Sequence, residues 1–232
     1  GIHDIETMNE VAAELQKYDP SLFIYGEGWT AGGSPLPDNM RALKTNTLKL
    51  KGIAAFSDEL RDGIKGHVFT PNAKGFATGE KNLEESVKFG IVGAIQHPQV
   101  DYKAVNYSKA PWANQPTQCI NYVSCHDNHS LYDRLVNSVP GITEPEIVKL
   151  IKFTQTIVLT SQGVPFLHAG EEITRTKFGV ENSFDSGDEI KNLGMVTFKF
   201  SCSTVDIPTM NACPHTIHLI HTSRMTPIPE DA

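Results

Sequence analysis

Residues 121 to 133 read Asn-Tyr-Val-Ser-Cys-His-Asp-Asn-His-Ser-Leu-Tyr-Asp, and the character of the sequence changes within them. The β-favouring run from Cys119 to Val123 ends where Ser124 to Asn128 bring side chains that are all small, polar or ionisable. This pattern predicts a buried strand followed by a polar loop. In α/β barrels the carboxyl ends of the parallel strands carry the working residues, so Cys125 to His129 is the first candidate for the rim of an active site. A solvated turn uses the same residue types and is the alternative interpretation.

Three other short apolar runs end in the same way. Each is typical of a strand followed by polar or glycine-rich residues, and they occupy 22–25, 53–56 and 164–168. Helical spacing of apolar residues predicts helices between these runs. One begins at a capping-box pattern, Thr7 to Glu10, and ends at Tyr18; another occupies 83–89; and a third begins at Thr143 and ends at Ser161.

The alternation of strands and helices predicts parallel strands joined by right-handed crossovers. Four such units make about the second half of a (β/α)8 TIM barrel, whose complete form takes roughly 250 residues or more. A doubly wound sheet is the competing α/β architecture, but no Gly-x-Gly-x-x-Gly follows any predicted strand, and polar residues follow all of them. We therefore predict a half barrel, and we expect the irregular stretch at 65–117 to cross its mouth as a long loop.

The composition excludes several classes of partner. The 232 residues carry a net charge of -7 and no block of basic residues, which argues against nucleic acid and anionic membrane surfaces. No apolar run approaches the roughly 18 residues of a membrane span. The four cysteines show no Cys-x-x-Cys spacing, so neither a structural zinc site nor a disulfide framework is predicted. The sequence signals no metal or other cofactor, leaves a structural calcium ion open, and contains no targeting signal that would define a compartment.

Two acidic residues at predicted strand ends indicate a sugar-cleaving site. Glu27 lies between Gly26 and Gly28 and close to Trp29. An aromatic neighbour lowers the local polarity and favours the protonated acid, while glycines let a bulky ligand approach the backbone. Asp127 supplies a second carboxyl group, expected on the same rim at the end of the next strand but one and within roughly 10 Å of the first, and glycoside hydrolysis uses two such groups. An exposed loop acid is the alternative interpretation of Glu27.

Four motifs resemble those of one known family. Tyr25-Gly26-Glu27-Gly28-Trp29 is similar to the general-acid motif of the type I pullulanases, which belong to the α-amylase superfamily of glycoside hydrolases. Tyr122 to His129 is similar to the transition-state-stabiliser motif of that family. Gly163-x-Pro165-x-x-x-x-Gly170-x-Glu172 resembles the motif at its last barrel strand, and Gly179 to Phe184 continues the pattern. The resemblance covers residues 1–190 and implies the C-terminal half of a catalytic barrel.

The resemblance also implies an activity and a set of site residues. The parent enzyme would hydrolyse α-1,6-glucosidic bonds of pullulan and other branched α-glucans by a retaining mechanism. Glu27 would protonate the leaving oxygen and later deprotonate water, while Asp127 would hold hydroxyl groups of the sugar ring being cleaved. An amylase-type α-glucanase of the same superfamily is the alternative within this class. The substrate-binding residues implied by the resemblance are His126, Trp29, Asn128, Arg175 and Asn182.

The sequence departs from the family pattern at both ends. The family's nucleophile is an Asp followed within three residues by Gly-Ile-His-Asp, and this chain begins at that Gly, which is Gly1. The nucleophile and the N-terminal half of the barrel, a missing partner, would then precede Gly1, and we expect the chain alone to be inactive. A catalytically inactive carbohydrate-binding fragment is therefore the alternative from another functional class. Residues 191–232 form a tail that does not resemble the family, and the cysteines and histidines there fit no common zinc spacing.

A half barrel leaves its first and last strands, at 22–25 and 164–168, without outer neighbours. Because unpaired strand edges invite association, we expect the isolated chain to dimerise or to aggregate through them. The side chains expected to face the interior and to lose cover are Ile24, Ala54, Val123 and Phe166.

Overall fold

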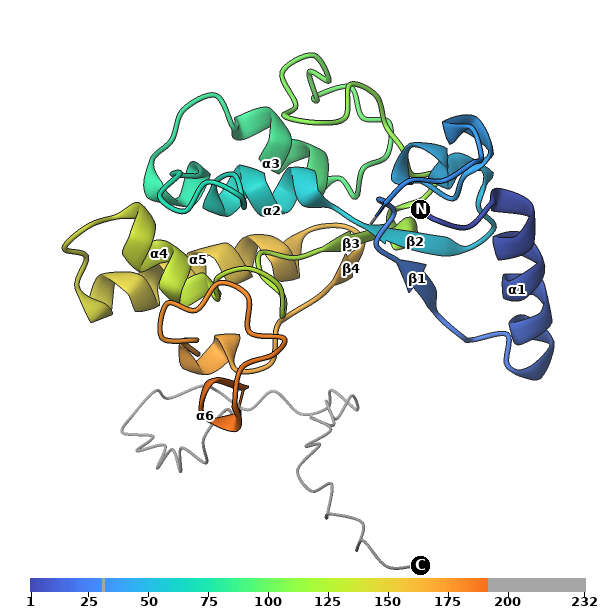
Figure 1. The fold of residues 1–232 in the computed structure, drawn as a ribbon. Coiled ribbons are helices and arrows are strands. Elements are labelled where there is room, and N and C mark those ends of the chain that lie inside the picture. The colour runs from blue at the N-terminus through green and yellow to red at the C-terminus, as the bar shows by residue number, and fades with distance from the viewer. Residues whose placement is uncertain (31, 192–232) are drawn as a thin grey trace, which may run out of the picture. The chain divides into compact units, whose positions relative to one another are not determined.

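A computed structural model describes residues 1–30 and 32–191 of the chain (Figure 1). The predicted tail at 191–232 lies outside the described residues, apart from Lys191. None of the helices in the described part of the chain is long and apolar enough to cross a membrane.

The centre of the fold is a parallel sheet in which the strands pair in the order β1-β2-β3-β4. In the register, Tyr25 lies opposite Ala54, Phe56 lies opposite Ile120, and Ile120 lies opposite Val164. Consecutive strands that pair in parallel are the arrangement of a barrel segment, so the predicted α/β fold, a partial (β/α)8 barrel, is confirmed. The strands are β1 (Ile24–Gly26), β2 (Ile53–Phe56), β3 (Cys119–Asn121) and β4 (Val164–Pro165).

Three of the strands differ in extent from the prediction. β1 begins later because the Leu22 N–H is held in a turn, where it donates to the Asp19 carbonyl at 3.1 Å. β4 is short because Pro165 has no N–H to give to a ladder. β3 ends at Asn121, before the predicted limit at Val123.

Several of the helices around the sheet begin at side-chain caps. Asp4 caps the first helix by accepting a hydrogen bond from the Thr7 N–H at 2.8 Å, so that helix begins before the predicted Thr7. Ser57 accepts a hydrogen bond from the Leu60 N–H at 3.3 Å, and the predicted start at Thr143 is present as a capping box with Glu146. The helix that follows Ser130 had no counterpart in the sequence prediction. The helices are α1 (Ile5–Tyr18), α2 (Asp58–Lys65), α3 (Glu84–Ile91), α4 (Leu131–Ser138), α5 (Glu144–Thr160) and α6 (Asp188–Lys191).

The two faces of the sheet have different surroundings, because successive side chains of a strand point to opposite sides. Ile53 packs with Ala12 of α1, and Val123 packs with α2, α4 and α5, so this face is covered by helices. Ile24 also packs on the covered face, and the expectation that Ile24 and Val123 point into the interior is wrong. The alternation places Ala54 and Phe166 on the other face, as expected.

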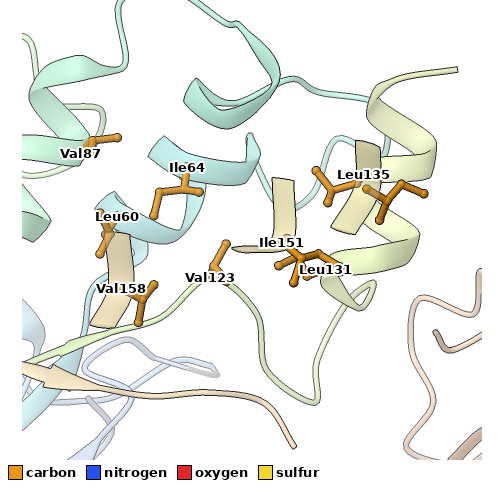
Figure 2. Close-up of a cluster of buried hydrophobic side chains, with 9 residues drawn as sticks. Leu60, Ile64, Val87, Val123, Leu131, Leu135, Ile151 and Val158 are labelled. Carbon is orange, nitrogen blue, oxygen red and sulfur yellow. The ribbon is translucent and has the colours of Figure 1, made fainter. Parts of the chain in front are cut away.

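The largest apolar cluster lies between Val123 and the helices that cover this face (Figure 2). Ile151 of α5 is 3% exposed within it and Leu135 of α4 is 1% exposed. Burial of a side chain of this size stabilises a fold by about 1.5 to 3 kcal/mol. The cluster contains Leu60, Ile64, Val87, Val123, Leu131, Leu135, Ile147, Ile151 and Val158.

The long stretch at 65–117 was expected to cross the mouth of the barrel, but its second half packs against the sheet instead. Val105 and Trp112 are buried in a cluster with Ala55 of β2 and Cys119 of β3. Both strand residues lie on the helix-covered face, so this part of the stretch extends the covering layer. The prediction failed because Val105 and Trp112 are isolated apolar residues among polar ones, with no helix or strand period to reveal their burial.

We predict that Ile151→Ala lowers the free energy of unfolding by about 2 to 4 kcal/mol, because it leaves a cavity in the largest cluster. Leu159→Ala, on the same helix but at a position 53% exposed, is the matched control and should cost less than about 1 kcal/mol. Urea unfolding followed by circular dichroism measures both values. Equal losses for the two variants would contradict the assignment of the core.

Candidate active site

The two candidate acids follow the carboxyl ends of alternate strands. Glu27 comes directly after β1, and Asp127 lies in the loop that follows β3, with β2 between the two strands. Because the sheet is parallel, both strand ends lie at the same edge. The predicted placement at the ends of strands that are neighbours but one is therefore confirmed. A separation of their carboxyl groups within roughly 10 Å stays a prediction.

The turn that carries Glu27 depends on Gly28. Its φ of 78° is in the left-handed region, and a Cβ on Gly28 would lie 3.0 Å from the Cβ atoms of both Ala55 and Lys44. The Gly28 carbonyl accepts a hydrogen bond from the Lys44 N–H at 2.6 Å. A glycine is therefore needed for both conformation and space, and this turn leaves the Glu27 side chain exposed.

The first residues of the chain pack against the same turn. The Arg41 Nε–H donates to the Gly1 carbonyl at 3.1 Å, and the Ala42 N–H donates to the His3 carbonyl at 2.8 Å. A side chain on Gly1 would also collide with the Trp29 carbonyl oxygen. Gly1 thus lies beside the turn that presents Glu27.

A group of aromatic rings lies on the face of the sheet that the helices leave uncovered. Phe56 is at its centre, with ring centroids 6.5 Å from Trp29, 5.0 Å from Tyr122 and 5.3 Å from Phe166. Tyr25 completes the group at 5.9 Å from Phe56. Sequence reasoning identified only Trp29, although the period-two alternation of the strands also indicates the others. Tyr25, which is 52% exposed, and Trp29 flank Glu27 in the sequence, so they bring apolar surface to the turn that carries this acid.

The loop after β3 presents two predicted residues to solvent. The side chains of His126 and Asp127 are 79% and 58% exposed, and the His126 Nε2 lies 3.4 Å from the Asp127 Oδ1. Asn128 has a φ of 59°, a left-handed conformation that asparagine tolerates better than most residues. The structure therefore brings His126 and Asp127 together as a neighbouring pair.

The other two predicted binding residues lie after β4. The Arg175 guanidinium donates to the Ala169 carbonyl at 3.0 Å and to the Lys191 carbonyl at 2.7 Å, and it lies 3.2 Å from the His168 Nε2. Through these contacts Arg175 stabilises the loop to which it belongs. Asn182 is exposed. Neither residue has a polar contact with Glu27 or Asp127 within the described ranges.

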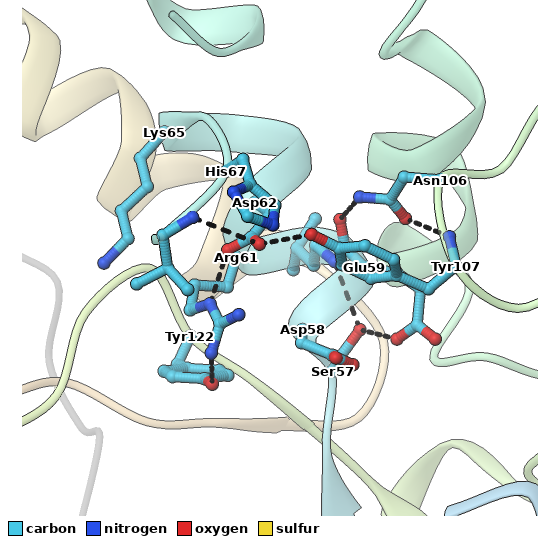
Figure 3. Close-up of polar contacts among 12 residues, drawn as sticks. Ser57, Asp58, Glu59, Arg61, Asp62, Lys65, His67, Asn106, Tyr107 and Tyr122 are labelled. Atoms are coloured by element: carbon cyan, nitrogen blue, oxygen red, sulfur yellow. Dashed lines mark hydrogen bonds and ion pairs between the residues drawn. The ribbon is translucent and has the colours of Figure 1, made fainter. Parts of the chain in front are cut away.

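A buried polar network supports the ends of β2 and β3 (Figure 3). The Arg61 Nη1–H donates to the Tyr122 hydroxyl at 2.9 Å, and its Nε–H donates to the Asp62 carboxylate at 2.5 Å. The Lys44 ammonium pairs with the Glu59 carboxylate at 2.9 Å. Buried charges persist when they are paired, as these are. The network holds the Tyr122 ring below the loop that carries Asp127, and sequence reasoning did not identify it.

Two titratable groups near this edge of the sheet, Glu171 and Lys65, are buried, and a third, His168, is half-buried. Glu171 is 3% exposed and accepts a hydrogen bond from the Ser124 hydroxyl at 3.2 Å. Burial raises the pKa of Glu171 to about 7. Burial also lowers the pKa of His168 to about 4, with the Arg175 charge adding to the effect, and it lowers the pKa of Lys65 to about 8. Throughout residues 1–30 and 32–191, no three His, Cys, Asp or Glu side chains gather as metal ligands.

Comparison with known proteins relates the chain to a set of enzymes, although no family model matches it. The pullulanase of Bacillus subtilis strain 168 is 37% identical over 193 residues, which is 83% of this chain and 26% of that protein. The crystal structure of a Paenibacillus barengoltzii pullulanase complexed with maltohexaose and alpha-cyclodextrin aligns with a TM-score of 0.74 and 44% identity, over 82% of this chain and 28% of that one. The type I pullulanase of Bacillus subtilis, complexed with maltose, aligns with a TM-score of 0.76 and 36% identity, over 84% and 26% of the two chains.

A partial (β/α)8 barrel whose strand ends carry acidic and aromatic side chains has the framework of a glycoside hydrolase catalytic domain. The family is that of the type I pullulanases, to which this chain is similar over most of its length. The chain spans about a quarter of the length of these relatives.

We predict that Glu171→Gln changes the pH dependence of stability. Since the pKa of Glu171 rises from 4.5 in the unfolded chain to about 7, the native state keeps a proton that the unfolded state loses, and stability falls as pH rises between these values. The variant has no carboxyl group to ionise at this position, so its stability does not fall in this way. Near pH 8 it should be more stable than the parent by about 1 to 3 kcal/mol.

Urea unfolding between about pH 5 and pH 8 tests this expectation. Glu80→Gln, at an exposed position, is the control and should leave the pH profile unchanged. A Glu171→Gln profile parallel to that of the parent would contradict the assignment.

Proposed function

We propose that this chain carries the general acid and the transition-state stabiliser of a pullulanase-like glycoside hydrolase, which cleaves α-1,6-glucosidic bonds of branched α-glucans with retention. The observation that supports this most directly is the position of Glu27 and Asp127, after the carboxyl ends of alternate parallel strands in a barrel segment related to pullulanases. Retaining glycosidases need an acid and further carboxylates around one sugar ring, and the position of both acids at one edge of the sheet supports such an arrangement.

In the proposed mechanism Glu27 gives its proton to the glycosidic oxygen and later takes a proton from the attacking water. Asp127 and His126 hold the hydroxyl groups of the ring that is cleaved, and their exposed, adjacent side chains suit this role. Trp29 stacks on a neighbouring glucose unit. Asn128, Arg175 and Asn182 are further proposed contacts with the glucan, of which Arg175 is already bonded within its own loop.

The position of Gly1 supports the same mechanism. The resemblance assigns the nucleophile to an Asp shortly before Gly-Ile-His-Asp, and Gly1 lies beside the turn that carries Glu27. A carboxylate in the residues that precede this glycine in the family would thus enter next to the acid. A double-displacement reaction needs the acid and the nucleophile to face the same bond, and a carboxylate at that place would meet this need.

We propose α-glucans as ligands. The related crystal structures are complexes with maltohexaose and alpha-cyclodextrin and with maltose, all built from α-linked glucose. Among the aromatic rings around Phe56, Tyr25 is 52% exposed and offers an apolar face on which a sugar ring can pack, whereas Tyr122 is 1% exposed and supports the group from below. An amylase-type α-glucanase shares this chemistry, and so does an inactive carbohydrate-binding fragment.

We predict that Trp29→Ala weakens the binding of maltotetraose by about tenfold, which corresponds to an aromatic contact of about 1.4 kcal/mol. Isothermal titration calorimetry on the 232-residue chain measures the affinity. Tyr18→Ala, on α1 and 88% exposed, is the matched aromatic control and should bind like the parent. If both variants bind equally well, Trp29 is not in the sugar site.

We also predict that the purified chain releases no more reducing sugar from pullulan or amylose than a buffer blank. Glu27 and Asp127 are assigned as acid and stabiliser, and neither replaces a covalent nucleophile. Clear hydrolysis that Glu27→Gln abolishes would show that the chain is catalytically sufficient. Release from amylose but not from pullulan would favour the amylase-type alternative.

A further inference from the structure

Lys177 is buried beneath the loop that carries Asp127. It is 1% exposed, and its ammonium donates to the carbonyl oxygens of His126 at 3.1 Å, of Glu181 at 2.8 Å and of Asn128. An ammonium group has three protons to donate, and these three carbonyls take one each. Sequence reasoning passed over this residue because it belongs to none of the motifs.

The contacts of Lys177 determine where Asp127 points. The carbonyls on either side of Asp127, those of His126 and Asn128, both turn inward to the same ammonium. The short backbone segment between them therefore bows outward, and Asn128 takes a φ of 59° to complete the bend. The Asp127 side chain consequently projects into solvent, where 58% of it is exposed.

The backbone around Lys177 is itself anchored to α4. The Lys177 N–H donates to the Asp133 carboxylate at 2.7 Å, and the Thr176 hydroxyl donates to the other oxygen of that carboxylate. Asp133 is 5% exposed and also accepts a hydrogen bond from the Ser130 hydroxyl at 2.8 Å. The lysine is thus fixed at its backbone before its side chain reaches the loop.

We propose that Lys177 is a positioning residue that fixes the 126–128 loop and the 181–182 segment relative to each other, so that Asp127 and Asn182 face one bound α-glucan. The proposal rests on the proposed function of Asp127. It goes beyond that function because it assigns the orientation of Asp127 to a side chain from the segment after β4. Lys177 does not touch the substrate, and its effect passes through the three carbonyls.

The test compares Lys177→Met, which keeps the length of the side chain but donates no hydrogen bond, with Lys152→Met. Lys152 is exposed on α5, and its side chain has no polar contact within the described part of the chain. Hydrogen exchange followed by mass spectrometry is measured on the full chain without sugar. We expect about tenfold faster exchange in peptides covering 124–130 and 178–183 of the Lys177→Met variant, and unchanged exchange in α5.

A second arm measures maltotetraose affinity by calorimetry. We expect Lys177→Met to bind about tenfold more weakly than the parent and Lys152→Met to bind equally well. Should the parent itself bind no maltotetraose, the proposed function fails, and the exchange arm still decides whether Lys177 orders the loop.

Three results would overturn the proposal. The first is exchange that stays slow in both loop segments of Lys177→Met. The second is exchange that accelerates as much in α5 as in the loops, which would make Lys177 a general stabilising residue. The third is failure of both Lys177→Met and Lys177→Gln to fold, since a glutamine retains a donor at that site.

Discussion

Parallel pairing of four short strands is the constraint on which the rest of the structure depends. The pairing brings all the carboxyl ends to one edge, and the period of two gives each face its own set of side chains. Helices and the stretch around Trp112 cover one face, and the other carries the aromatic rings around Phe56. A shift of one residue in the register would exchange these two sets, so the positions of core and candidate site are determined together.

The edge of the sheet is built on buried charges that are paired or neutralised. Arg61 is bonded to Asp62 and Tyr122, and Lys44 is bonded to Glu59. Glu171 instead lies in a site that favours its neutral, protonated form near pH 6. Burial lowers the pKa of His168, so His168 changes the pH dependence of stability in the opposite direction. Between pH 4 and 6.5 the unfolded chain takes up a proton that native His168 does not hold, so stability rises with pH there and offsets the effect of Glu171.

Much of this arrangement could be predicted from the sequence, because it depends on local pattern. Apolar runs followed by polar residues indicated the strand ends, and with them Glu27 and Asp127. The buried network of Arg61 and Tyr122 could not be found in this way, since its members are 61 positions apart and each is an ordinary residue for its element. The helix after Ser130 was missed because its polar neighbours favoured a loop, and its 8 residues contain only three aliphatic side chains, Leu131, Leu135 and Val136.

The three carbonyl contacts of Lys177 bear on the order in which the molecule folds. Two of them join residues 49 and 51 positions apart, with α5 and β4 in the intervening sequence, so a long stretch of chain must be ordered before these contacts close. The loop after β3 therefore reaches its final shape late in folding. In partial unfolding from the native state the order is reversed. The loop after β3 is held by few contacts, so we expect it to open before the helical core does. The chain can thus retain its secondary structure while the surface around Asp127 is already lost.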